Sequence, residues 1–283
     1  MKMQPSRRTF LGAAAGAAGL SAFGAGTAAA VIEAEPWGMK IGVATYSLRD
    51  FDRTTCIAML KKLQVKYVSI KDVHLKLTES PEELRQHRKE FDDAGLVVTS
   101  GGNVDMTKAT TVEELRPKFE YAKNAGLPMM VCAPTHENIK NVEALVKEYN
   151  IRIAIHNHGP EDKHFPTPQS VLEVVRKLDK RCGLCMDIGH STRAGADIVK
   201  SAAEAGDRLF DLHVKDLADA TKRDSQTDIG DGILPFPALF KQLKKMSYTG
   251  CVNMEYEINS KDPMVGMLRS LSYERGVLAG LAG

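Results

Sequence analysis

The feature that most constrains the fold is a regular alternation of short apolar runs and amphipathic segments, which repeats eight times after residue 35. Short runs rich in Val, Ile and Leu are typical of buried strands, and longer segments that begin at a capping residue are typical of helices. Such alternation predicts a parallel sheet with helical connections. Eight units in about 250 residues favour one α/β domain, a closed (β/α)8 TIM barrel, over an open doubly wound sheet.

Start signals and apolar runs give the expected elements. Strands are expected at 40–46, 65–71, 96–100, 128–132, 151–156, 182–187, 209–214 and 250–255. Helices are expected at 53–63, 81–94, 112–125, 137–149, 168–178, 197–205, 235–246 and from 263 onward. Ser80 with Glu83 and Thr111 with Glu114 have the spacing of capping boxes. The first strand is not followed by a glycine-rich phosphate fingerprint, which weakens a dinucleotide-binding interpretation.

The N-terminal segment has the parts of a signal peptide. Arg7-Arg8 precedes an Ala/Gly-rich run over 12–30, and small residues continue to Ala34. The adjacent arginines followed by Phe10-Leu11 resemble a twin-arginine export signal. We therefore expect a signal over 1–34, the twin-arginine machinery as a partner, and a mature domain over 35–283 that is periplasmic or extracellular. A membrane anchor or a chance Ala-rich helix is the alternative.

Charge and cysteine usage exclude several classes. The formal net charge is +2, so electrostatics gives no case for a nucleic-acid partner. No other apolar run approaches the roughly 20 residues of a membrane span. An odd number of cysteines (56, 132, 182, 185 and 251) favours buried thiols over a disulfide framework. Cys182 and Cys185 have the spacing of a zinc or redox pair, but they lie within a predicted strand. The helix faces indicate no interface, and a homo-oligomer is left open.

Polar side chains gather where the last four strands end. Chemistry in a barrel of this kind occurs at the carboxyl ends of the strands. Imidazole and carboxylate together suit one divalent ion such as Mn²⁺, Zn²⁺, Co²⁺ or Fe²⁺. Asp187, His213 and Glu255 are candidate ligands. His156 or His158 is the candidate from the fifth strand, and the other would contact the substrate. A hydrogen-bonded polar cluster without a metal is the alternative.

Five motifs in order resemble those of the xylose-isomerase-like TIM-barrel family: 42–49, 155–160, 185–190, 211–216 and 250–255. That family includes sugar phosphate isomerases and epimerases, inosose dehydratases and, distantly, endonuclease IV. The resemblance implies that Asp187, His213 and Glu255 hold the metal and that His190 contacts the substrate. Many relatives have Glu at the fifth-strand position of His156, and the dehydratase branch has a similar His-x-His. We assign the fourth metal position to His158 and a catalytic role to His156, although either can be the ligand.

The expected activity is that of a metal-dependent sugar isomerase or epimerase. The metal would polarise a carbonyl and acidify the adjacent C–H. Glu255 or His156 would remove that proton, and Lys215 or His190 would stabilise the enediolate or return a proton. The remaining expected substrate contacts are Tyr46, Lys71, His74 and Arg193.

Two other functions stay open at this point. A lyase or dehydratase acting on a keto-sugar, keto-glycoside or inosose would use the same enediolate. A barrel that binds a carbohydrate without chemistry would keep the fold and lose proton exchange. A DNA-repair nuclease is disfavoured, because the third strand offers only Gly101, Gly102 and Asn103 where that enzyme needs a histidine.

Overall fold

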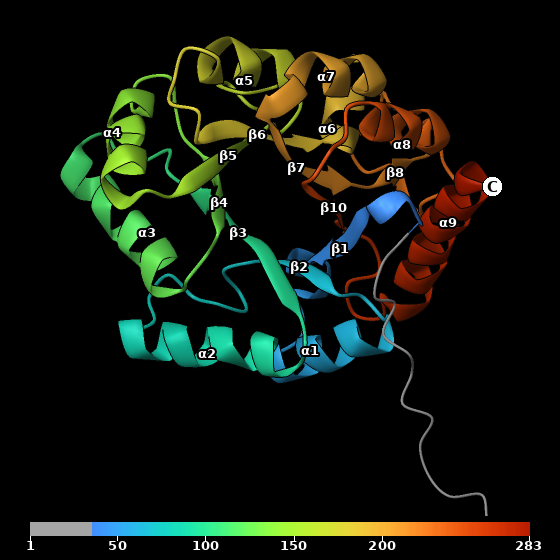
Figure 1. Ribbon diagram of the computed structural model, residues 1–283, viewed down its shortest axis with the longest axis horizontal. Helices are drawn as coiled ribbons and strands as arrows, with labels where there is room; N and C mark the ends of the chain where they lie inside the picture. The colour runs from blue at the N-terminus through green and yellow to red at the C-terminus, as the bar shows by residue number, and fades with distance from the viewer. Residues whose placement is uncertain (1–35) are drawn as a thin grey trace, which may run out of the picture. The chain divides into compact units, whose positions relative to one another are not determined.

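The computed structural model describes residues 36–283, and the predicted signal over 1–34 lies outside them. Over the described residues, eight parallel strands close into a barrel in the order β1-β10-β7-β6-β5-β4-β3-β2. Figure 1 shows helices forming a ring around these strands. The predicted (β/α)8 barrel is confirmed.

The barrel strands lie close to the expected ranges. They are β1 Lys40–Ala44, β2 Tyr67–Ile70, β3 Val97–Asp105, β4 Met129–Ala133, β5 Arg152–His156, β6 Cys182–Asp187, β7 Leu209–Val214 and β10 Cys251–Met254. β1 is shorter than expected because Thr45–Leu48 turns into a 3-10 helix. β3 is longer and reaches Asp105, with a register shift against β4 between Gly101 and Val104.

The helices follow their predicted start signals. They are α1 Arg53–Lys62, α2 Pro81–Asp93, α3 Val112–Asn124, α4 Ile139–Tyr149, α5 Pro168–Val175, α6 Ile188–Arg193, α7 Ile198–Ala205, α8 Phe236–Lys245 and α9 Met264–Ala282. Both predicted capping boxes are present, at Ser80 and at Thr111. The short α6 is unexpected. It begins directly after β6 because Asp187 Oδ1 accepts a hydrogen bond from the His190 backbone N–H at 2.7 Å.

A small hairpin, β8 Asp216–Leu217 and β9 Gln226–Thr227, lies in the segment between β7 and α8. The buried carboxylate of Asp216 folds this loop by accepting hydrogen bonds from backbone N–H groups farther along it. The Gln226 side chain then donates to the Glu255 carbonyl at 2.8 Å and accepts from the Glu257 N–H at 3.0 Å. The hairpin therefore fixes the backbone that follows β10.

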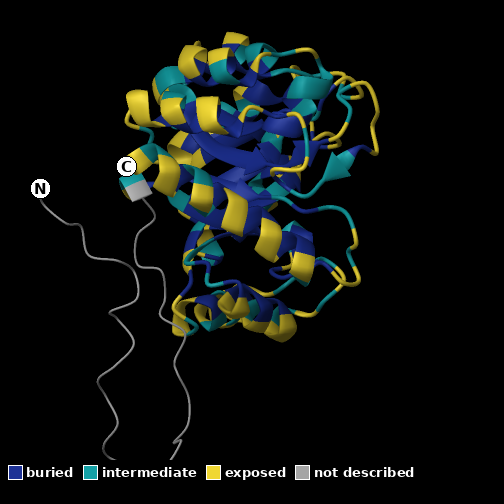
Figure 2. Cartoon of the chain, turned by 90° about the vertical axis from the view of Figure 1, so that its right-hand side faces the viewer, coloured by how far each residue is buried: buried dark blue, intermediate teal, exposed yellow. Residues whose placement is uncertain are grey.

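Two apolar clusters make the core. The larger one lies between the strands and the surrounding helices, and Figure 2 shows buried strands inside helices whose outer faces are exposed. The smaller one comprises Met129, Val131, Ala154, Cys185 and Phe210. Its members on β5 and β6 lie two residues before His156 and Asp187, so they share the inward face of the barrel one layer deeper.

The cysteines match the expectation of buried thiols. All five cysteines lie in the described part of the chain, and each is a buried free thiol. Within residues 36–283, no helix is both long and apolar enough to cross a membrane.

Candidate metal centre

Four side chains at the carboxyl ends of consecutive barrel strands converge on one point. His156 ends β5, Asp187 ends β6, His213 lies on β7 and Glu255 directly follows β10. One ligand atom of each lies within 4.8 Å of the others. His156 Nε2 is 3.1 Å from His213 Nδ1 and 3.7 Å from Asp187 Oδ2. His213 Nδ1 is 3.5 Å from Glu255 Oε1. Two imidazole nitrogens and two carboxylate oxygens form a donor set for a divalent ion.

The charges in this group support the fit to a metal. Asp187 Oδ2 is buried and makes no hydrogen bond of regular geometry, but it is paired by charge with Lys215 Nζ at 3.0 Å. A buried carboxylate needs compensating charge. A cation between the carboxylates and imidazoles would add to the charge that Lys215 supplies. The donor set suits Mn²⁺, Zn²⁺, Co²⁺ and Fe²⁺ alike.

Lys215 provides the positive charge next to this group. Its buried ammonium lies 3.0 Å from Asp187 Oδ2 and 2.9 Å from Glu255 Oε2, and it also bonds Glu257. Burial alone would lower the pKa of Lys215, but the carboxylates of Asp187, Glu255 and Glu257 outweigh burial and raise that pKa well above its ordinary value. Lys215 is therefore a permanent cation that partly balances the carboxylates.

The two candidate proton carriers differ in charge. Burial raises the pKa of Glu255, but the charges of Lys215 and His213 outweigh burial and lower that pKa well below the ordinary glutamate value. Burial, together with the neighbouring histidines, lowers the pKa of His156 well below 6.5. At neutral pH Glu255 is thus an anion and His156 is a neutral imidazole. Both can accept a proton, but only Glu255 carries a negative charge.

On the fifth strand the structure brings His156, and not His158, into the four-residue group. His158 has 35% of its side chain exposed, and its Nδ1 lies 3.4 Å from Asp162 Oδ2. Its Nε2 lies 2.9 Å from the amide of Asn103. The geometry therefore places His156, to which a catalytic role was assigned, in the four-residue group and leaves His158, which was assigned to the metal, outside it. β5 ends at His156, so the direction of the His158 side chain is set by the loop that follows.

A polar cavity of about 770 Å³ adjoins the group. Four predicted residues line it, namely His158, His190, Arg193 and Lys215. Arg193 is held by an ion pair with Glu161. Burial lowers the pKa of His190, so this imidazole is neutral at pH 7. Further polar lining residues, which were not among the predicted site residues, are Asn103, Asp105, Thr107, Glu161, Asp162, Lys163, His164, Arg223, Asp224, Gln226 and Glu257. Of these, Glu257 was signalled by its position two residues after Glu255.

The three substrate contacts expected near the first strands lie away from the cavity lining. His74 is 1% exposed, and its ring nitrogens lie 3.0 Å from Thr45 Oγ1 and 3.1 Å from the Phe51 carbonyl. These bonds explain His74 as a core residue. Lys71 Nζ bonds the Asn103 carbonyl at 3.2 Å and lies 5.5 Å from the Tyr46 ring, so both side chains pack beside the cavity wall.

Comparison with known proteins decides the family. Residues 57–273 match the xylose isomerase-like TIM barrel family. The chain belongs to this family. An uncharacterised protein of Methanocaldococcus jannaschii is 29% identical over 122 residues, which cover 41% of this chain and 41% of that protein. The match thus spans under half the length of this relative.

Two solved structures show the same fold. The 3-keto-D-glucoside 4-epimerase YcjR of E. coli has a TM-score of 0.68 at 17% identity, covering 84% of this chain and 99% of its own. The IolI protein with a bound zinc atom has a TM-score of 0.70 at 18% identity, covering 86% and 99%. At these identities the likeness to the two structures establishes the barrel fold alone. The chemistry of the metal centre follows from the residues of this chain.

Proposed function

We propose that this protein is a divalent-metal-dependent sugar isomerase or epimerase that removes a proton from the carbon next to a carbonyl. The observation that carries the proposal is the convergence of His156, Asp187, His213 and Glu255 beside a polar cavity. The fold likeness to a keto-glucoside epimerase and to a zinc-bound barrel protein supports the choice of a sugar and of a metal.

The residues of the chain divide the chemistry among them. A divalent ion bound by the four ligands would act as a Lewis acid toward the carbonyl oxygen of the substrate. Glu255 is the general base, because it is ionised and its second oxygen contacts only Lys215. Lys215 lies next to the position where negative charge would develop, and its fixed ammonium stabilises that charge. His190, on the cavity wall, holds a substrate hydroxyl.

The cavity indicates a polar substrate. Nearly all of its lining side chains are charged or hydrogen-bonding, and among the described residues it contains no glycine-rich phosphate loop. Arg193 is paired with Glu161, and Lys215 with its carboxylates, so neither of these two cations is free for a phosphate. The other cations of the lining are Lys163 and Arg223. We infer an unphosphorylated sugar or keto-glycoside.

A lyase or dehydratase is the second candidate, and one observation favours it. The two proton carriers are unlike, since Glu255 is an anion and His156 a neutral imidazole. A symmetric exchange between two faces of a carbon is better served by two equal carboxylates. Proton removal by Glu255 with loss of a neighbouring leaving group needs only one base.

Deuterium exchange tests the proposal. The Mn²⁺-loaded protein is incubated in D₂O with a panel of ketoses and 3-keto-glycosides, and the products are read by NMR. We expect deuterium at the carbon next to the carbonyl, and loss of that exchange in Glu255→Gln. Exchange with a rearranged sugar supports isomerisation or epimerisation, and exchange with release of a leaving group supports the lyase. Tight sugar binding without exchange would identify a carbohydrate-binding barrel and refute the enzyme.

We also propose that the chain is exported through a twin-arginine signal over residues 1–34. The supporting observation is the Arg7-Arg8 pair ahead of the small-residue apolar run. Replacement of both arginines by lysine is expected to retain the full-length chain in the cytoplasm, whereas replacement of Lys2 by Arg is not. Normal export of the double-lysine variant would contradict this signal type.

A further inference from the structure

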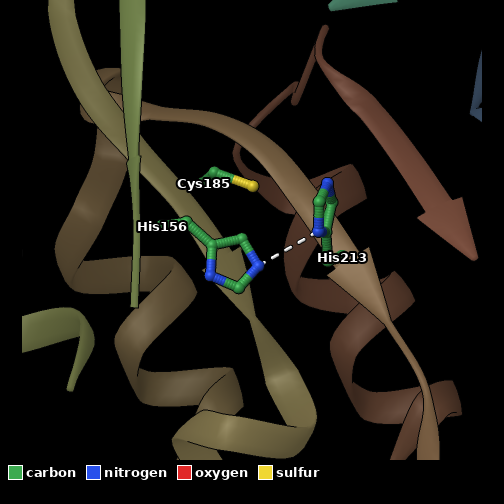
Figure 3. Close-up of side chains that lie close together, drawn as sticks. All are labelled: His156, Cys185 and His213. Atoms are coloured by element: carbon green, nitrogen blue, oxygen red, sulfur yellow. Dashed lines mark hydrogen bonds between the residues drawn. The ribbon is translucent and has the colours of Figure 1, made fainter. Parts of the chain in front are cut away.

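The thiol of Cys185 lies one layer below the metal centre. Cys185 precedes Asp187 by two residues on β6, so both side chains point into the barrel. Its sulfur and one nitrogen each of His156 and His213 lie within 4.8 Å of one another. Figure 3 shows the Cys185 side chain directed toward the His213 ring, with the His156 ring below the sulfur in this view.

Two further observations indicate that this space can hold a ligand. His156 Nδ1 and His213 Nε2 are buried and have no hydrogen-bond partner, so neither ring is held in place through its second nitrogen and both rings can turn toward Cys185. The carboxylate opposite Cys185, Asp211, is already satisfied by Ser100 at 2.8 Å and Asn253 at 2.7 Å. The free donors at this depth are therefore imidazole and sulfur.

We propose a second, deeper metal position formed by His156, Cys185 and His213, which takes thiophilic divalent ions such as Zn²⁺, Cd²⁺ and Co²⁺. Sulfur and imidazole select such ions over Mn²⁺, which prefers oxygen. Zinc binds sulfur at about 2.3 Å and imidazole at about 2.0–2.1 Å, so donors within 4.8 Å need only small side-chain rotations. On binding, the metal–sulfur bond replaces the S–H bond, and the proton is released to solvent.

The two positions exclude each other because both draw on His156 and His213. An ion in the deeper position leaves Asp187 and Glu255 to Lys215 and withdraws both imidazoles from the outer one. Thiophilic ions are therefore expected to displace Mn²⁺ from the outer position and to inhibit the proposed activity. This inference shares two ligands with the proposed centre but does not depend on catalysis there.

Absorption spectroscopy tests the deeper position. The metal-free full chain is titrated with Cd²⁺ and Co²⁺, and the near-ultraviolet sulfur-to-metal charge-transfer band is recorded. We expect a band that saturates at one ion per chain. Cys185→Ser is expected to abolish it, and Cys182→Ser is expected to keep it. Cys182 is a matched control, because it is a buried thiol on the same strand. Its side chain belongs to the larger apolar cluster, between the strands and the helices.

Further measurements separate this inference from the proposed function. Asp187→Asn is expected to lose Mn²⁺ binding and keep the Cd²⁺ band, whereas Cys185→Ser is expected to keep Mn²⁺ binding. Circular dichroism checks that both variants fold. X-ray absorption of the Zn²⁺-loaded wild-type chain gives a readout that needs no variant, and we expect one sulfur neighbour at about 2.3 Å. Absence of the band in the wild type, an unchanged band in Cys185→Ser, or a zinc shell without sulfur would overturn the proposal.

Discussion

Replacing Lys215 by Met is predicted to destabilise the metal-free protein and to tighten its binding of Mn²⁺. The ammonium contacts the carboxylates of Asp187 and Glu255 at 3.0 and 2.9 Å, and the three side chains are 4%, 0% and 12% exposed. Met has a similar shape without the charge. The two buried carboxylates then lose their ammonium partner, and the counter-charge that remains comes from His213 and from a bound metal.

The structure sets the size of the effect. Removing one partner of a buried ion pair costs about 3–5 kcal/mol. Glu257 is not counted, because 37% of its side chain is exposed and water can solvate it. For a domain of this size, each kcal/mol lowers the unfolding midpoint by about 2–4 °C, so we expect a fall of about 6–20 °C. Mn²⁺ at about 100 times its dissociation constant returns roughly 2.7 kcal/mol of stability.

Differential scanning fluorimetry in EDTA and in excess Mn²⁺, with isothermal titration of Mn²⁺, measures both effects. Lys222→Met is the matched control, because Lys222 pairs with Asp219 at the surface and is 75% exposed. Screening by water makes such a pair nearly neutral for stability, and no resolvable change is expected. An unchanged midpoint of metal-free Lys215→Met, or weaker Mn²⁺ binding by it, would refute the reasoning.

Three further predictions follow from the structure. Ser80→Ala removes the cap of α2 and is expected to cost about 1 kcal/mol, measured as a lower thermal midpoint, with Ser80→Thr as the control that keeps the cap. Burial lowers the pKa of His74 below 6.5, so at mildly acidic pH the unfolded chain takes up a proton there that the folded chain does not. The thermal midpoint is therefore expected to fall as the pH drops below about 6.5, and to fall less in His74→Asn. Gln226→Ala frees the backbone after β10 and is expected to lower turnover without releasing the metal, and loss of bound metal from this variant would speak against that role.

Most of the fold was predictable because local signals and global architecture agree. The capping boxes at Ser80 and Thr111 mark helix starts through contacts three residues apart, which a sequence displays directly. The all-buried runs of β6 and β7 match their predicted bounds, since strands covered on both faces read as continuous apolar segments. The helix α6 was missed, because its cap is Asp187, whose charge had been interpreted only as a metal ligand.

The site was predictable where a strand carries its ligand, and less so where the chain leaves the strand. Asp187 and His213 lie within β6 and β7, so their inward direction follows from the strand. His158 lies beyond the end of β5, and its direction depends on Asp162 and Asn103. Those contacts are made by loops whose paths no local pattern specifies.

The positions of Gln226 and His74 depend on contacts with distant parts of the chain. Gln226 reaches the site only because the Asp216 carboxylate folds the preceding loop into a hairpin. His74 follows a strand, as a substrate contact would, but partners on two other segments hold it in the core. Such long-range hydrogen bonds are set by tertiary structure.

In the proposed centre, His156, Asp187, His213 and Glu255 together hold one divalent ion. Anomalous diffraction from crystals of the protein soaked in Mn²⁺ locates that ion. We expect a single strong peak within bonding distance of all four side chains. A peak beside His158 and Asp162, or no peak among the four side chains at saturating Mn²⁺, would contradict it.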